Sequence, residues 1–83
     1  MELLIISPHY RQEHTIVWLD ILTPYGNFVI QKGHAPMIID LLFDHPFTFA
    51  LENGVQKSVH VRHGVLTVDR TKATIIMNEP ENG

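Results

Sequence analysis

Cysteine is absent from this sequence of 83 residues, and positive charge is scarce. The lack of cysteine excludes a disulfide scaffold, a cysteine zinc site and a thiol nucleophile. Six Lys and Arg residues against nine Asp and Glu residues give a net charge of −3. These six cations are scattered along the chain, whereas binding to a phosphate backbone needs them clustered. Nucleic acid is therefore not an expected partner.

Long apolar runs and catalytic motifs are also missing. The N-terminal apolar run spans only Leu3 to Ile6 and follows an acidic residue, so we expect neither an export signal nor a membrane span. The phosphate-binding signatures G-x-x-x-x-G-K-[ST] and G-x-G-x-x-G do not occur, and neither does the nucleophile turn G-x-S-x-G. The sequence predicts no catalytic residue, no cofactor and no enzyme activity.

Six histidines invite a metal or acid–base hypothesis. A metal site needs side chains that converge, whereas His60 and His63 are three residues apart in a predicted strand and point to opposite faces. Carboxylates do not cluster beside the histidines in the sequence either. We therefore expect no metal site.

What the sequence does contain is β-branched residues in short runs. With 45% hydrophobic and 18% charged residues, the chain is typical of a single ordered globular domain. The turn signals at close intervals predict an all-β fold, a small β-sandwich or flattened barrel of about 8–10 short, mostly antiparallel strands. This domain is expected to cover residues 1–78, and a polar tail is expected at residues 79–83.

The segment Thr15–Thr23, TIVWLDILT, is predicted to be a strand that is apolar on both faces. Strict alternation of side chains places Val17, Leu19 and Ile21 on one face. The other face then carries Ile16, Trp18, Asp20 and Leu22. Two interpretations follow: either a second apolar surface is covered by a partner protein, or the strand twists at a corner and buries different faces along its length.

Three turns separate the predicted strands. Residues 23–27, TPYGN, predict a tight connection into the strand that begins at Phe28. Asn53 and Gly54 predict a type I′ hairpin turn with positive φ at both positions. A further hairpin turn is predicted from Asp69 to Lys72.

The stretch KGHAP at residues 32–36 predicts a rigid corner. Gly33 permits a backbone conformation that is closed to other residues, while Pro36 fixes its own φ and pushes Ala35 toward extended geometry. The imidazole of His34 either bonds the loop backbone and holds the corner or faces a partner.

The order of these features resembles the N-terminal β-sandwich of the epsilon subunit of bacterial and chloroplast F-type ATP synthases, which is equivalent to the mitochondrial delta subunit. The resemblance depends on GHAP at its place in the order and on RHGVLTVDRTKATII at residues 62–76. It implies a non-catalytic central-stalk subunit that couples rotation to ATP synthesis in a proton- or sodium-translocating complex. The alternative is a stand-alone β-sandwich interaction module that is unrelated to ATP synthase.

The same resemblance implies which residues meet partner subunits. Ser7, His34 and Ile39 match positions that face the gamma subunit. The loop that touches the c-ring corresponds to Tyr25, Gly26 and Asn27. The complex is expected on the cytoplasmic face of the inner (plasma) membrane, which the chain meets only through the complex. The two C-terminal helices common in the family are expected to be absent, and an uncovered apolar face leaves self-association of isolated copies open.

Overall fold

The computed structural model describes residues 1–78 of the protein, and these residues form eight β-strands. The strands are β1 (Glu2–Ile6), β2 (Arg11–Thr23), β3 (Gly26–Ile30), β4 (Met37–Asp40), β5 (His45–Leu51), β6 (Gln56–Val61), β7 (Gly64–Val68) and β8 (Lys72–Met77). The all-β prediction is confirmed. The polar tail predicted at residues 79–83 lies outside the described residues.

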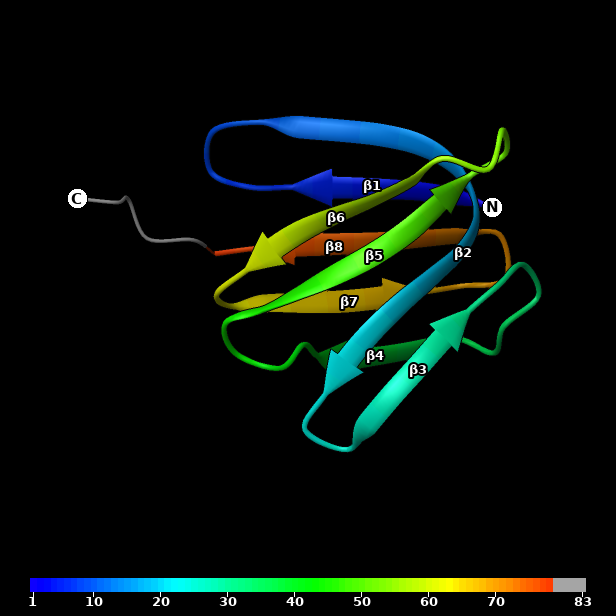
Figure 1. Ribbon diagram of the computed structural model, residues 1–83. Coiled ribbons are helices and arrows are strands. Elements are labelled where there is room, and N and C mark those ends of the chain that lie inside the picture. The colour runs from blue at the N-terminus through cyan, green and yellow to red at the C-terminus, as the bar shows by residue number, and fades with distance from the viewer. Residues whose placement is uncertain (79–83) are drawn as a thin grey trace.

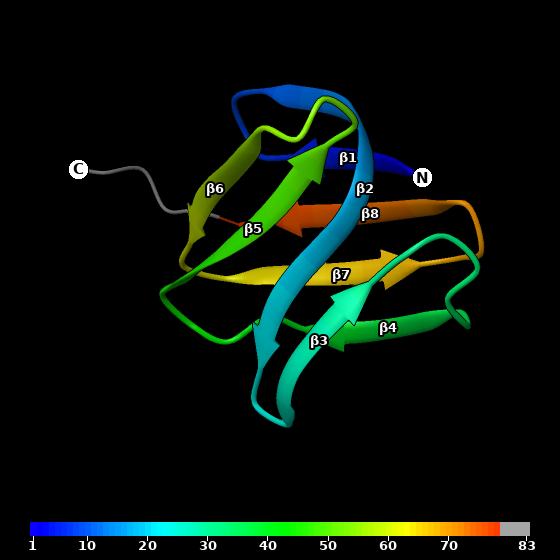
Figure 2. The same ribbon diagram turned by 45° about the vertical axis from the view of Figure 1, so that its right-hand side comes forward.

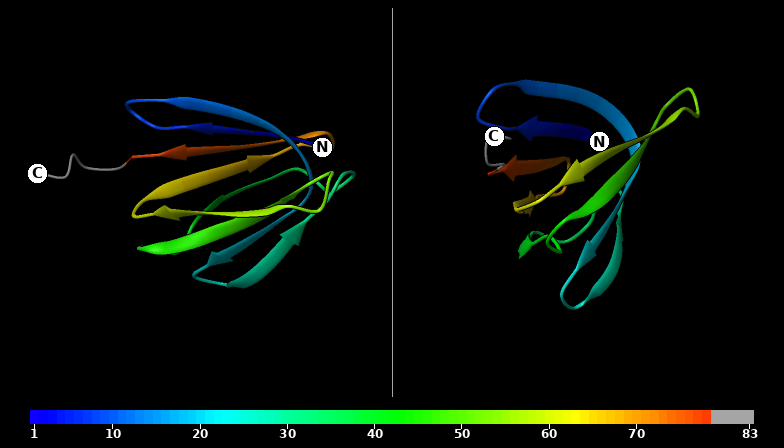
Figure 3. Two further views of the ribbon diagram at one scale, coloured as in Figure 1. Left: turned by 45° about the horizontal axis from the view of Figure 1, so that its top comes forward. Right: turned by 60° about the vertical axis from the view of Figure 1, so that its left-hand side comes forward.

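The strands form two layers that face each other (Figure 1). The first sheet has the order β4-β7-β8-β1-β2, and the second contains β3, β2, β5 and β6. Strand β2 belongs to both sheets, pairing with β1 through its first five residues and with β3 and β5 through the rest. Neighbouring strands are antiparallel except β1 and β8, which pair in parallel. The predicted sandwich with mostly antiparallel strands is confirmed, and Figure 3 shows how β2 curls from one layer to the other.

The core lies between the layers and takes side chains from both sheets. In the first sheet, Leu3, Ile5 and Ile75 are at most 1% exposed, and Leu19 and Phe49 of the second sheet face them with the same degree of burial. Each such side chain contributes about 1.5–3 kcal/mol of transfer free energy relative to an exposed one. This shared core fixes the two sheets against each other.

Strand β2 does not alternate strictly along its length. The pairing register with β5 shifts between Ile16 and Trp18, which marks a β-bulge. Ile16 is buried, Val17 is exposed, and from Leu19 onward the odd-numbered side chains point into the core. The prediction that Val17 shares a face with Leu19 is therefore wrong, because a bulge adds one residue and reverses which side chains point inward. The interpretation of a twisting corner strand is confirmed.

The turn between β5 and β6 also differs from the prediction. In the described part of the chain, positive φ falls on Gly54 (91°) and not on Asn53. The amide of Gly54 donates to the carbonyl oxygen of Leu51, and the amide of Leu51 donates to that of Val55. The loop thus spans the four residues 52–55, with a left-handed glycine at the third position, whereas a type I′ turn has two central residues with positive φ.

The predicted turn at Asp69 and the predicted corner at Gly33 both form from local contacts. The carboxylate of Asp69 accepts the backbone amides of Thr71 and Lys72, each at 2.9 Å. These two hydrogen bonds lower the pKa of Asp69 below its ordinary value of 3.8, the bond from Thr71 contributing most. At the corner between β3 and β4, Gly33 has a φ of 88°, in the region that glycine adopts at no steric cost.

Candidate functional site

Ser7, one of the residues expected to face a partner, lies in the loop between β1 and β2. Its hydroxyl oxygen accepts the backbone amide of Tyr10 at 3.2 Å and that of His9 at 3.4 Å. The side chain of Ser7 therefore organises its own loop, and the loop forms one rim of the first sheet.

His34 lies at the opposite rim of the same sheet. Strands β1 and β8 are parallel and both β4 and β8 are antiparallel to β7, so the start of β4 and the end of β1 lie at opposite ends of the sheet. Figure 2 shows the two loops on opposite sides of the molecule. The Nδ1 atom of His34 lies 2.8 Å from the carbonyl oxygen of Ala35, as the backbone-bonding interpretation expects. The structure does not bring Ser7 and His34 together.

The two consecutive isoleucines of strand β4 point to opposite faces of the first sheet. Ile39 is half-buried and packs against the core, whereas Ile38 is 77% exposed on the outer face of the first sheet. Ile39 was expected to contact a partner, and of the two residues Ile38 has the more exposed side chain. Sequence reasoning did not single out Ile38, because the two residues are chemically identical and the pairing of β4 with β7 sets which of them faces outward.

The outer face of the first sheet carries an apolar surface that sequence reasoning did not place. Five residues on five neighbouring strands are in register across this face, and we call them the outer row: Asp40, Val65, Ile76, Ile6 and Arg11. Val65 is 38% exposed and Ile76 is 50% exposed. Two apolar side chains on neighbouring strands are therefore exposed side by side in the middle of this face.

A groove continues this surface toward the loop between β4 and β5. The ring of Phe43 is exposed there, 4.8 Å from the ring of His63 and 5.6 Å from the guanidinium carbon of Arg62. The groove is lined by Pro24, Asp40, Leu41, Leu42, Phe43, His63, Gly64, Val65, Ile76 and Asn78. The cation–π and ring contacts therefore orient the exposed ring of Phe43 in the groove.

The turn between β2 and β3 lies at one end of the second sheet (Figure 1). Tyr25 at its tip is 83% exposed, and Gly26 already pairs with Thr23 as the first residue of β3. The Thr23 hydroxyl accepts the Tyr25 amide at 3.0 Å and donates to the Gly26 carbonyl oxygen at 2.9 Å. The Asn27 amide nitrogen donates to Asp20 and to the carbonyl oxygen of Ile21. The hairpin is therefore stiff, with one aromatic side chain presented at its end.

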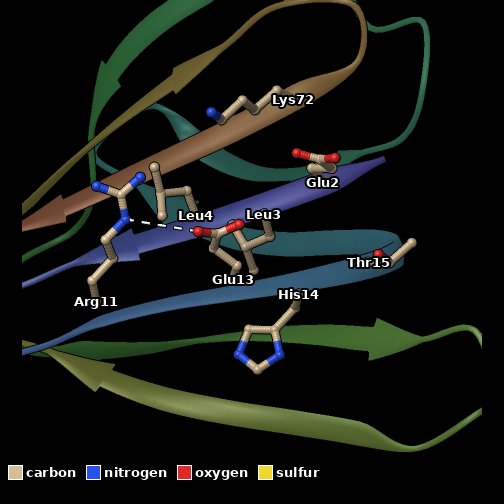
Figure 4. Close-up of a pocket in the computed structure, with 8 residues that line it drawn as sticks. All are labelled: Glu2, Leu3, Leu4, Arg11, Glu13, His14, Thr15 and Lys72. Carbon is tan, nitrogen blue, oxygen red and sulfur yellow. Dashed lines mark ion pairs between the residues drawn. The ribbon is translucent and has the colours of Figure 1, made fainter.

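A second hollow, drawn in Figure 4, lies over β1, β2 and β8 and has a charged rim. Arg11 and Glu13 form an exposed ion pair at 3.8 Å, and Glu2 and Lys72 stand across the hollow. The negative charges of these two carboxylates and the positive charges of the two cations cancel around the hollow. The side chain of Leu4, which also lines it, is buried. Such a rim is typical of a solvated surface.

One histidine meets a carboxylate. The Nε2 atom of His60 lies 3.0 Å from a carboxylate oxygen of Asp44, which has a φ of 61°. This contact joins β6 to the loop before β5, so the two residues are far apart in the sequence. Among residues 1–78, however, no three His, Cys, Asp or Glu side chains converge as metal ligands. This same part of the chain contains no helix long and apolar enough to cross a membrane.

The fold and its surfaces define a small β-sandwich domain with one uncovered apolar face. Residues 1–83 match the family described as the ATP synthase, Delta/Epsilon chain, beta-sandwich domain, and the chain belongs to this family. No curated protein sequence is significantly similar to the chain.

Solved structures share the fold at low sequence identity. One is a chain of the Euglena gracilis mitochondrial ATP synthase, with a TM-score of 0.83, 17% identity and coverage of 90% of this chain and 48% of that chain. Another comes from the central stalk and c-ring of the Tetrahymena thermophila mitochondrial ATP synthase, with a TM-score of 0.78, 15% identity and coverage of 95% and 63%. The chain thus spans about half to two thirds of the length of these chains.

The family match confirms the resemblance to the epsilon subunit. It also decides between the two classes of function that the sequence left open, because an interaction module unrelated to ATP synthase does not belong to this family. The expectation of a non-catalytic ATP synthase subunit agrees with the family.

Proposed function

We propose that the chain is a rotor part of an F-type ATP synthase, one that docks on the gamma subunit and the c-ring and couples rotation to ATP synthesis. Its family membership carries this proposal. The Tetrahymena chain of the same fold, taken from a central stalk with its c-ring, adds support. The corresponding location is the cytoplasmic face of the inner (plasma) membrane, reached through the complex.

The apolar outer face of the first sheet is the surface proposed to meet the gamma subunit. It lies between the Ser7 loop and the His34 corner, so one partner that covers the sheet reaches both rims. Ile38, exposed on the same face, is a contact there, and Ile39 supports it from beneath. A stiff sandwich transmits torque through shape and apolar contact without chemistry of its own.

The turn with Tyr25, Gly26 and Asn27 is proposed to meet the c-ring. Its aromatic tip is exposed on a hairpin held by the Thr23 hydroxyl. Tyrosine provides a large contact area with few rotatable bonds, which suits a lasting contact with another protein.

Binding to the purified gamma subunit of the same organism tests the proposal. Wild-type chain is expected to form a complex, and Ile38→Glu is expected to weaken it at least about tenfold because a charge then opposes an apolar surface. Val29→Glu is the matched control, since Val29 is 51% exposed on β3 of the second sheet. The proposed face is contradicted if the gamma subunit does not bind the wild-type chain, or if it binds the two variants equally well.

A further inference from the structure

The loop between β5 and β6 contains an asparagine followed directly by a glycine. Asn53 and Gly54 are both exposed in this loop at one end of the second sheet (Figure 1). Asparagine is a thermolabile residue, because its side-chain amide can react with the backbone nitrogen of the next residue. A glycine in that position has no side chain to shield the nitrogen. Among residues 1–78, no atom lies within 4 Å of the place where a Cβ atom of Gly54 would stand, so the nitrogen is accessible.

Two hydrogen bonds hold these residues in the loop. The side-chain oxygen Oδ1 of Asn53 accepts the backbone amide of Val55 at 3.0 Å. This bond polarises the side-chain carbonyl, and it stabilises the negative charge that gathers on Oδ1 when a nucleophile adds to the carbonyl carbon. The amide of Gly54 donates to the carbonyl oxygen of Leu51, also at 3.0 Å. This second bond has to open before the nitrogen of Gly54 can react.

The opening of the second bond is a local change. The amide of Gly54 belongs to the exposed loop and not to the ladder between β5 and β6, which begins at the pair of Ala50 with Gln56. Hydrogen bonds in exposed loops open at low free-energy cost while the core stays folded. The reaction therefore does not require unfolding of the sandwich.

We propose that Asn53 is a site of spontaneous deamidation in the folded protein. Hydroxide removes the proton of the Gly54 amide, and the nitrogen then attacks the side-chain carbonyl carbon Cγ of Asn53. A bond forms between this nitrogen and Cγ, the bond between Cγ and Nδ2 breaks, and Nδ2 takes up a proton from water and leaves as ammonia. Water then opens the succinimide ring at either of its carbonyl carbons and gives aspartate or isoaspartate. Both products carry a negative charge that asparagine lacks.

Asn27 lies in a strand and provides an internal control. Its side-chain nitrogen donates to Asp20 and to the carbonyl oxygen of Ile21. The next residue, Phe28, pairs with Ile21 of β2 and has a half-buried side chain, so its nitrogen is part of the ladder between β2 and β3. Ring closure at Asn27 requires these two strands to separate. We therefore expect Asn53 to react while Asn27 stays intact.

Peptide mapping of aged protein measures the two sites separately. Trypsin releases residues 33–57 as one peptide, in which Asn53 is the one asparagine. Asn27 falls in the peptide 12–32, and the Asn-Gly pair at residues 82–83 falls in a third. The full chain is kept at mildly alkaline pH for several weeks, and mass spectrometry follows the conversion of amide to acid in each peptide. Freshly purified protein digested in parallel is the blank, and circular dichroism confirms that the aged chain is folded.

A synthetic peptide of residues 49–57 provides the rate without the fold. Conversion of Asn53 in the protein is expected within about tenfold of the rate in this peptide, because the loop opens readily. Isoaspartate among the products, detected by enzymatic methylation, identifies the succinimide route, since direct hydrolysis of the amide gives aspartate alone. Asn53→Gln is expected to abolish conversion in the peptide 33–57, because the longer side chain closes its ring much more slowly.

Two results overturn the proposal. One is a rate in the folded chain more than about tenfold below that of the synthetic peptide, which shows that the bond from Gly54 to Leu51 protects the site. The other is aspartate without isoaspartate at Asn53. The experiment uses the chain alone, so its result is independent of the proposed function.

Discussion

The outer faces of the two sheets differ in chemistry although one core lies beneath both. On the first sheet, Val65 and Ile76 stand in register in the outer row. On the second sheet, polar pairs stand beside an exposed apolar side chain: the hydroxyls of Thr48 and Ser58 bond across β5 and β6 at 2.8 Å and Asp20 bonds Asn27 across β2 and β3, while Val29 is 51% exposed. A sandwich needs one buried face per sheet, so folding alone does not explain the exposed Ile38, Val65 and Ile76 on the first sheet.

The largest expected effect separates the two faces of a single strand. Ile75 is fully buried and Ile76 is half-exposed, side by side on β8. Ile75→Ala is expected to lower the free energy of unfolding by about 2–4 kcal/mol, through lost transfer energy and a cavity. Ile76→Ala is expected to cost less than about 1 kcal/mol. Urea denaturation at low micromolar concentration measures both, and equal costs would show that Ile76 is packed in the isolated monomer.

The second largest effect is expected at the corner between β3 and β4, which connects the two sheets. Gly33 has a φ of 88°, which side chains rarely adopt. Gly33→Ala is expected to destabilise the fold by about 1–2 kcal/mol through backbone strain. A steric clash does not contribute, because nothing lies within 4 Å of an added Cβ atom. Lys32→Ala, next to it and exposed, serves as the control. If the two variants unfold at the same urea concentration, the corner is not strained by a side chain.

A smaller effect tests the polar face of the second sheet. Thr48→Val removes the hydroxyl bond to Ser58 and is expected to cost about 0.5 kcal/mol in urea denaturation. Thr67→Val, on the first sheet opposite Ile38, is expected to leave stability within about 0.5 kcal/mol of wild type. A larger loss of stability for Thr67→Val than for Thr48→Val would contradict the assigned difference between the two faces.

The smallest effect depends on pH. Because folding lowers the pKa of Asp69, the charged carboxylate stabilises the turn above its unfolded pKa, and this contribution is lost as the pH falls below 3.8 toward the folded pKa. Asp69→Asn is expected to be slightly less stable than wild type at pH 7, with the difference shrinking toward pH 3. Thermal melts across this range measure it, and a difference that grows on acidification contradicts the assigned cause.

Local features of the fold could be predicted from the sequence. The corner at Gly33 and the turn at Asp69 are each specified by residues within four positions of one another, so local chemistry decides them. The GHAP corner and the last hairpin were also enough to indicate the family. The type I′ assignment at Asn53 failed because a glycine after Asn is compatible with more than one loop length.

Long-range features could not be predicted. The bulge at Val17 depends on the pairing of β2 with β5, and the exposure of Ile38 rather than Ile39 depends on the register of β4 with β7. A shift of one residue in register exchanges the two faces of a strand. The outer row unites residues from five strands, so no short segment of the sequence reveals it.

The parallel pairing of β1 with β8 has a consequence for synthesis on the ribosome. Among the described strands, the first along the sequence, β1, lies in the interior of the first sheet, between β2 and β8. Until β8 has left the exit tunnel, one edge of β1 lacks its neighbour, and β7 and β4 have no strand through which to join the sheet. The nascent domain therefore carries an open hydrogen-bonding edge until β8 can pair with β1, and chaperones protect such an edge during this interval.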